Sequence, residues 1–216
     1  MSILTPVQKL IFDQISKSPF IRSNFYFTGG TALSEFYLKH RFSEDLDFFS
    51  EKKFEIDQVR REVSLWTKEL NFSYKSQQKG FTYFFFFKFK NNKSIKVDFG
   101  YYPPQRVEKG KIYKKITIDS LLDIAINKFA AIHQRSASKD IADLYFLLKK
   151  FTIWDLIEGA KIKFHMETDP WILSSDLLFA TKDINTLPRM IKRVTLYELK
   201  NFFLQLALKL GKKAIR

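Results

Sequence analysis

Apolar positions in the first half of the chain follow two different spacings. Spacings of three and four residues place apolar side chains on one face of a helix, and they predict helices over residues 3–18, 31–39 and 55–70. Aromatic runs and alternating positions are typical of strands, and they predict strands over residues 25–28, 46–49, 81–89 and 94–101. The polar turn Asn91-Asn92-Lys93 joins the last two strands as a hairpin.

After residue 118 the pattern becomes helical. It predicts helices over residues 119–134, 139–151, 153–163 and 196–211, with a less regular stretch before the last of them. No internal repeat or low-complexity linker interrupts the sequence. A mixed segment followed by a helical one predicts an α+β fold, with a mixed sheet flanked by helices over residues 1–115 and a helical subdomain over residues 116–216.

The composition is that of a folded protein with a sizeable core. Of 216 residues, 45% are hydrophobic, and 24 Phe and 9 Tyr supply large side chains for burial. The absence of cysteine excludes disulfides and thiolate chemistry. The N-terminus lacks the apolar stretch of a secretory signal, and the longest apolar run, residues 81–87, is too short to span a bilayer. We therefore expect a cytoplasmic protein that does not enter a membrane.

The net charge of +14 suggests a polyanionic partner, of which nucleic acid is the commonest. General solubility in a lysine-rich proteome explains the same surplus equally well. Basic residues are frequent in the second half, at Lys149, Lys150, Lys161, Lys163, Arg189, Lys192, Arg193, Lys212 and Lys213. If they line a cleft, they would hold an RNA backbone.

Two carboxylates, Asp45 and Asp47, are the first candidates for chemistry. Residues two apart in a strand point to the same face, and adjacent carboxylates repel each other unless a cation lies between them. Hard oxygen ligands at this spacing suit Mg²⁺. An exposed edge strand with an acidic face is the alternative explanation of the same pattern.

Gly29-Gly30-Thr31 lies upstream, where a predicted strand turns into a helix. Glycines let a backbone approach a phosphate closely, and the start of a helix offers free N–H groups. The Thr31 hydroxyl is a further donor. A glycine turn in which Thr31 caps the helix is the alternative.

Asp98 lies in the alternating segment Ser94–Gly100, where it shares a face with Lys96. If this strand pairs beside the strand 46–49, Asp98 joins Asp45 and Asp47 on one face of the sheet. Three carboxylates could hold two metal ions, one activating an attacking hydroxyl and one bridging a triphosphate. A solvent-facing Asp in a hairpin is the alternative.

A lysine and an aspartate stand out in the helical half. Lys128 flanks an apolar helix face, where it could hold phosphates or extend along the surface as a structural side chain. Asp140 falls inside the apolar stripe of the next helix and needs a partner there, for which Lys128, Arg135 and Lys139 are candidates. A favourable interaction of Asp140 with the start of its helix is the alternative.

In combination, these motifs resemble the DNA polymerase β-like nucleotidyltransferase superfamily. The resemblance is carried by GGTAL, Arg41, Ser43-x-Asp45-x-Asp47 and Val97-Asp98. The segments NKFAAIHQRSASKDIADLYFLL and DINTLPRMIKRVTLYELKNFF are similar to the AbiEii/AbiGii toxin branch, and the resemblance covers residues 20 to 205.

The resemblance implies a role for each motif. Gly29, Gly30, Thr31 and Arg41 would bind the NTP, and Asp45, Asp47 and Asp98 would bind Mg²⁺, with Asp98 as a further ligand or a base. Lys128 would bind phosphate, and Asp140, or Asp143 in the same helix, would complete a second motif pair. Thr31 stands where many superfamily members have Ser, which keeps the hydroxyl.

The leading functional hypothesis is therefore a Mg²⁺-dependent toxin that transfers a nucleoside monophosphate from an NTP to RNA, such as a tRNA 3′ end. Such toxins accompany a cognate antitoxin. Two other hypotheses remain: a catalytically silent module that binds a nucleotide or RNA, and a transferase that modifies a protein or a small molecule of the aminoglycoside type. Retention of Asp45, Asp47, Asp98 and Lys128 argues against the silent module, whereas the basic excess favours RNA over a small molecule.

Overall fold

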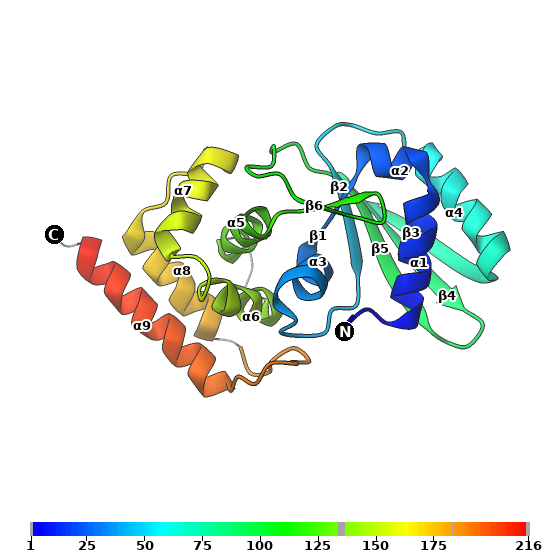
Figure 1. Ribbon diagram of the computed structural model, residues 1–216. Coiled ribbons are helices and arrows are strands. Elements are labelled where there is room, and N and C mark those ends of the chain that lie inside the picture. The colour runs from blue at the N-terminus through cyan, green and yellow to red at the C-terminus, as the bar shows by residue number, and fades with distance from the viewer. Residues whose placement is uncertain (1, 134–136, 183, 215–216) are drawn as a thin grey trace. The chain divides into compact units, whose positions relative to one another are not determined.

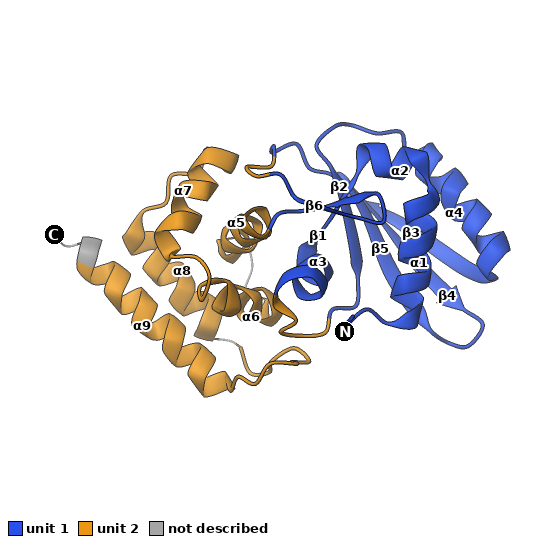
Figure 2. Ribbon diagram, viewed as in Figure 1, with its two compact units in different colours: residues 1–37, 43–105, 109–120 blue, residues 38–42, 106–108, 121–216 orange. Residues whose placement is uncertain are grey.

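The computed structural model describes residues 2–133, 137–182 and 184–214, which fall into two compact units (Figure 2). The first unit comprises residues 1–37, 43–105 and 109–120, and the second comprises residues 38–42, 106–108 and 121–216. The chain therefore passes between the units more than once. The functional boundary after residue 115 stays a prediction.

The first unit is a mixed sheet with helices. The helices are α1 (Pro6–Lys17), α2 (Pro19–Asn24), α3 (Gly29–Leu33) and α4 (Ile56–Leu70), and Ser34–Leu38 forms a π-helical turn. The strands are β1 (Tyr26–Thr28), β2 (Leu46–Ser50), β3 (Phe72–Lys79), β4 (Thr82–Phe89), β5 (Ser94–Tyr101), β6 (Lys111–Tyr113) and β7 (Ile116–Ile118). Within the described residues they form one sheet in the order β3-β4-β5-β2-β1-β7-β6 (Figure 1). The pairs β2–β5 and β1–β7 are parallel, and the others are antiparallel.

Phenylalanine rings fill the core between this sheet and α1. The ring centroids of Phe27 and Phe48, on neighbouring strands, are 5.0 Å apart, and Phe12 of α1 meets Phe27 edge to face at 5.2 Å. The start of α1 is fixed by a capping box, in which Thr5 and Gln8 exchange side-chain and backbone hydrogen bonds. Because side chains alternate along a strand, the residues between the core positions of β2 and β5 face the other side of the sheet.

The second unit is helical over its described residues. Its helices are α5 (Leu121–Ile132), α6 (Ser138–Leu147), α7 (Ile153–Phe164), α8 (Pro170–Lys182) and α9 (Leu196–Ala214). The Lys163 ammonium on α7 lies 2.6 Å from the Asp123 carboxylate on α5, and both side chains are fully buried. The backbone N–H groups of Val107 and Glu108 donate to the same carboxylate, which holds residues 106–108 in this unit. Lys163 is thus an interior residue, and its prediction as part of a basic surface is wrong.

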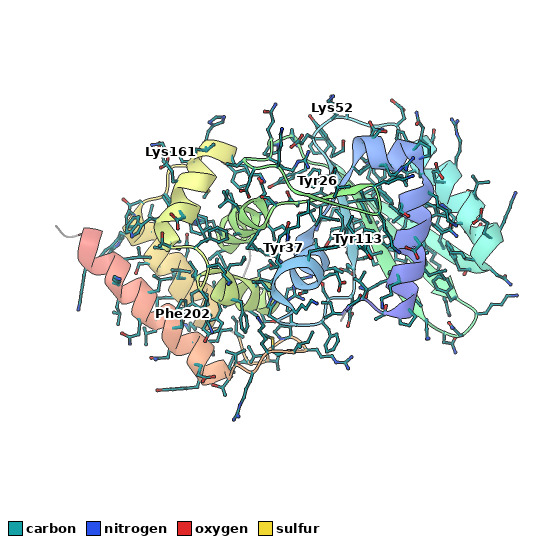
Figure 3. All side chains as sticks on the ribbon, viewed as in Figure 1. Tyr26, Tyr37, Lys52, Tyr113, Lys161 and Phe202 are labelled. Carbon is teal, nitrogen blue, oxygen red and sulfur yellow. The ribbon has the colours of Figure 1, made fainter. Side chains whose placement is uncertain are left out.

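Aromatic edges also pack within this helical unit. Phe202 of α9, labelled in Figure 3, meets Tyr145 of α6 edge to face with ring centroids 5.1 Å apart. Arg189 lies over the Phe42 ring at 4.3 Å. No helix over the described residues is long and apolar enough to cross a membrane.

The α+β class predicted from the pattern is confirmed, but several elements differ. The prediction lacks β3, whose polar sequence forms the exposed edge of the sheet, and it also lacks β6, β7, α2 and α8. The helix predicted over residues 31–39 begins at Gly29 and becomes π-helical at Ser34. Strand β2 begins at Leu46, so Asp45 precedes the strand instead of lying in it. Residues 134–136, including the candidate partner Arg135, lie outside the described residues.

Candidate active site

The parallel pairing of β2 with β5 brings two of the predicted carboxylates together. Asp47 lies opposite Asp98 in the register, and Leu46 lies opposite Val97. Asp45 directly precedes Leu46, as Lys96 precedes Val97, so a second polar pair stands beside the first. The condition under which Asp98 joins Asp45 and Asp47 on one face is therefore met.

A lysine ammonium lies between two of these carboxylates. Lys96 Nζ is 2.6 Å from Asp98 Oδ2 and 3.1 Å from Asp45 Oδ2, and it lies 5.2 Å from the centroid of the Phe84 ring. Partial burial lowers the pKa of Lys96, but the hydrogen bond and charge of Asp98, assisted by Asp45, outweigh this and raise that pKa above its usual value. The ammonium therefore stays charged and acts as the local counter-ion.

The surroundings of Asp98 disfavour its ionised form. Burial and the charge of Asp47 raise the pKa of Asp98 to about 7, even though Lys96 acts in the opposite direction. Asp98 Oδ1 is buried and has no hydrogen-bond partner among the described residues. A buried carboxylate oxygen without a donor is costly, so a proton or a cation at Asp98 Oδ1 would be favourable.

The Gly29 turn lies against Asp47. Gly29 has a φ of +74°, and a Cβ added there would lie 2.2 Å from Asp47 Oδ2. Both the backbone conformation and the space therefore require glycine. The Thr31 hydroxyl is buried and donates to the Asp45 carbonyl oxygen, so Thr31 fixes the backbone of Asp45 just before β2. Phosphate binding by Gly29, Gly30 and Thr31 stays a prediction.

The donor set on this face fits a hard divalent cation. Carboxylate oxygens are the ligands that Mg²⁺ prefers, and the unpartnered Asp98 Oδ1 marks a demand for positive charge. Among the described residues, however, no three acidic or histidine side chains converge as a ready set of metal ligands. The Lys96 ammonium lies between Asp45 and Asp98, within reach of both carboxylates.

A second charged cluster lies in the helical unit. Lys128 Nζ on α5 is 2.6 Å from Asp140 Oδ1 and 2.7 Å from Asp143 Oδ2, both on α6, and all three side chains are buried. Both aspartates therefore contact Lys128, and which of them completes the second motif pair stays a prediction. Lys139, the other described candidate, is exposed.

Arg41 belongs to this second cluster as well. Its Nε lies 2.6 Å from Asp143 Oδ1 and its Nη2 lies 2.8 Å from Oδ2, a two-point contact. His40 Nε2 lies 2.7 Å from Oδ1. Burial lowers the pKa of His40 despite Asp143, so the ring is neutral at pH 7, and Nε2 must carry the proton that it donates. Asp143 therefore accepts four hydrogen bonds, which saturates its lone pairs.

The charges in this cluster hold Asp143 ionised. Burial alone would raise the pKa of Asp143, but the Lys128 charge and the hydrogen bonds from Arg41 and His40 outweigh it and hold that pKa far below the usual range. The segment with His40 and Arg41 is fixed in turn by residues 189–192. Phe42 N donates to the Arg189 carbonyl, and Ile191 N and Lys192 N donate to the His40 carbonyl.

The family follows from comparison with known proteins. A family model described as "Nucleotidyl transferase AbiEii toxin, Type IV TA system" matches residues 10–213. The chain belongs to the AbiEii family. It therefore has the fold and family of a nucleotidyltransferase enzyme, and the resemblance seen in its motifs is confirmed.

This AbiEii chain is also similar to individual proteins and solved structures. An uncharacterized protein of Aquifex aeolicus (strain VF5) is 36% identical over 146 residues, which cover 66% of each protein, just under two thirds of that relative. The crystal structure of JHP933 from Helicobacter pylori has a TM-score of 0.57 at 23% identity, covering 96% of this chain and 90% of that one. A second H. pylori structure, of a candidate nucleotidyltransferase, has a TM-score of 0.59 at 23% identity over 98% of both chains. At this identity, the two structures show the fold alone.

The predicted site residues of the AbiEii chain thus form two groups. Asp45, Asp47 and Asp98 meet at the glycine turn in the first unit, whereas Arg41, Lys128 and Asp140 meet in the second. The sequence analysis did not select Lys96 or His40. Lys96 could have been found, because it shares a strand face with Asp98. His40 carries no local signal, since its partner Asp143 is 103 positions away.

Proposed function

We propose that this AbiEii-family chain transfers a nucleoside monophosphate from an NTP to the 3′ end of an RNA, with Mg²⁺ held by Asp45, Asp47 and Asp98. The observation that carries the proposal is the register of β2 and β5, which pairs Asp47 with Asp98 beside the close turn at Gly29. One or two ions would bind there. Bound Mg²⁺ supplies charge neutralisation for the triphosphate and favours ionisation of the attacking hydroxyl.

The residues of the chain position the reactants and take up a proton. The acceptor hydroxyl oxygen forms a bond to the α-phosphorus, and the bond from that phosphorus to the bridging oxygen breaks, so that pyrophosphate leaves. Asp98 Oδ1, which has no hydrogen-bond partner among the described residues, is the atom placed to accept the hydroxyl proton or to serve as a ligand. Gly29 leaves the space in which Asp47 can lie against the turn.

The buried cluster in the helical unit would have a structural role. Lys128 is bonded to two buried carboxylates and Arg41 to one, so we propose that they order the helical unit and the segment 38–42. Direct phosphate binding by Lys128 or Arg41, and a catalytic part for Asp140, stay predictions. They require these side chains to leave the partners that they have.

RNA is the acceptor that the charge favours. The net charge is +14, and Lys149, Lys192 and Arg193 are exposed on the helical unit. Cations that contact phosphates release counter-ions, so binding should weaken steeply as salt rises. A tRNA 3′ end is the first RNA to test. A protein or small-molecule acceptor would leave the basic surplus without a function.

The decisive experiment supplies each α-³²P-labelled NTP with Mg²⁺ and total RNA, and follows label on denaturing gels. Label should enter RNA with the wild type and with Asp57→Asn, an exposed control, but not with Asp47→Asn. Label on protein or on an added aminoglycoside would instead identify the other class of transferase. NTP binding without transfer to any acceptor would instead support the hypothesis of a catalytically silent binding module.

The toxin role needs a test in cells. Expression of the wild type should arrest growth, and Asp47→Asn should relieve the arrest at equal protein level. Because the family is described as a type IV toxin–antitoxin system, co-expression of an adjacent gene should also restore growth. Equal arrest by wild type and Asp47→Asn would separate toxicity from catalysis and contradict the proposal.

A further inference from the structure

Lys96 contacts two of the predicted metal ligands, and the sequence assigns it no role. Its ammonium lies within hydrogen-bonding distance of Asp98 and within 3.1 Å of Asp45. These are two of the three carboxylates proposed to bind Mg²⁺. A divalent ion that bound both of them would face a positive charge at close range, and the two cations repel each other strongly at such separations.

The side chain of Lys96 is able to give way. Its backbone is fixed in the middle of the sheet by pairing of β5 with β2 and β4, but the ammonium is carried on a flexible four-carbon stem. The side chain is 26% exposed. The neighbouring Phe84 ring offers a second, weaker site for a cation. The carboxylates can therefore exchange the ammonium for another cation without rearrangement of the strands.

We propose that Lys96 is a built-in counter-ion that makes divalent metal binding depend on nucleotide. This inference rests on the proposed function. Metal arriving alone must displace the ammonium from its carboxylates and leave it without an anion. Metal arriving with an NTP brings phosphate charge that neutralises the displaced ammonium. Metal and nucleotide should therefore bind with positive coupling, and the coupling should be reciprocal.

Removal of the ammonium should uncouple the two ligands. In Lys96→Met, Mn²⁺ used as the probe should bind in the absence of nucleotide about tenfold or more tightly than in the wild type, because the competing charge is gone. The gain in Mn²⁺ affinity on adding nucleotide should shrink by a similar factor. Lys96→Arg, which keeps the charge, should retain most of the coupling.

The experiment measures free Mn²⁺ by electron paramagnetic resonance, with and without a mixture of the four α,β-methylene NTPs. Protein-free controls correct for Mn²⁺ bound by the nucleotides themselves. Lys88→Met, an exposed lysine on the adjacent strand β4, controls for the change in net charge. Lys96→Gln serves if Lys96→Met does not fold, since an amide can still donate to Asp98, and circular dichroism verifies the fold.

The outcomes separate this inference from the proposed function. Equal Mn²⁺ affinity in Lys96→Met or Lys96→Gln and in the wild type, with equal coupling to nucleotide, would overturn the role of Lys96 while leaving the metal site intact. An effect of equal size in Lys88→Met would also overturn it, because general charge would then be the cause. Failure of every variant and of the wild type to bind Mn²⁺, with or without nucleotide, would overturn the metal site itself.

Discussion

The two charged clusters of this protein contain similar residues but differ in electrostatic balance. In the helical unit, Asp143 accepts hydrogen bonds from Arg41, His40 and Lys128, and no lone pair is left over. On the sheet, Asp45 and Asp98 share the ammonium of Lys96, the charge of Asp47 acts against ionisation of Asp98, and Asp98 Oδ1 has no hydrogen-bond partner among the described residues. A satisfied buried network stabilises a fold, whereas an unbalanced one marks a place prepared for a ligand. We therefore propose a structural role for the cluster in the helical unit and a catalytic role for the cluster on the sheet.

The largest expected effect is on catalysis at the sheet. Asp47→Asn and Asp98→Asn should each lower the transfer rate by about a thousandfold or more, since charge stabilisation at a metal site contributes several kcal/mol to the transition state. Their stability should be unchanged or higher, because each removes repulsion between carboxylates. Transfer kinetics and urea unfolding of the same samples check this. Loss of stability comparable to that of an Asp143 variant would abolish the distinction between the clusters.

The matching change in the helical unit should affect stability most. Asp143→Asn removes the buried negative charge that the Arg41 guanidinium and the Lys128 ammonium contact, so the free energy of unfolding should fall by about 3–5 kcal/mol. Asp57→Asn makes the same chemical change at an exposed pair with Arg60, 68% exposed on the Asp side, and should cost less than about 1 kcal/mol. Urea unfolding measures both. Similar losses for the two variants would mean that the buried network contributes no more to stability than an exposed ion pair does.

A smaller effect tests the closeness of the glycine turn to Asp47. Gly29 and Gly80 both have positive φ, but a Cβ at Gly80 would meet nothing within 4 Å. Gly80→Ala should therefore cost about 1 kcal/mol from backbone strain alone. Gly29→Ala should cost at least twice as much, because its methyl group also displaces the Asp47 carboxylate. Equal losses in thermal unfolding would show that the turn and the carboxylate are not in contact.

The smallest effect is a dependence of stability on acid pH. The pKa of Asp143 is depressed in the folded state by Lys128, Arg41 and His40, whereas it is about 3.9 in the unfolded chain. Its contribution is therefore complete above pH 4 and declines as the pH falls toward the folded pKa. Below pH 4, the wild type should lose about 1.4 kcal/mol per pH unit more than Asp143→Asn does. Parallel stability curves between pH 5 and pH 3 would contradict this.

The same contrast explains what the sequence could predict. Asp47 and Asp98 lie on strands whose alternation is visible locally, and Asp45 directly precedes β2, so the grouping of the three follows once β2 and β5 are paired. The contact of Lys128 with Asp140 spans only 12 positions, and the two helices are adjacent in sequence. By contrast, nothing near Arg41 or His40 indicates Asp143, because spatial proximity over such separations comes from the fold and not from local periodicity. Strand β3 escaped prediction for another reason, since an exposed edge strand needs no apolar alternation.

The long sequence separations between contacting residues have a consequence for synthesis of the chain. Arg41 is made 102 residues before Asp143, its carboxylate partner, and Phe27 of β1 long before Ile118, its neighbour on β7. At ribosomal rates of about 5–20 residues per second, roughly 5–20 s pass between the synthesis of Arg41 and that of Asp143. Each unit contains residues that are synthesised far apart in time. Neither the sheet nor the helical unit can therefore finish folding before its later residues have been made. A fragment that begins at residue 121 would lack His40 and Arg41, so the helical half made by itself should carry residues 38–42 on a linker.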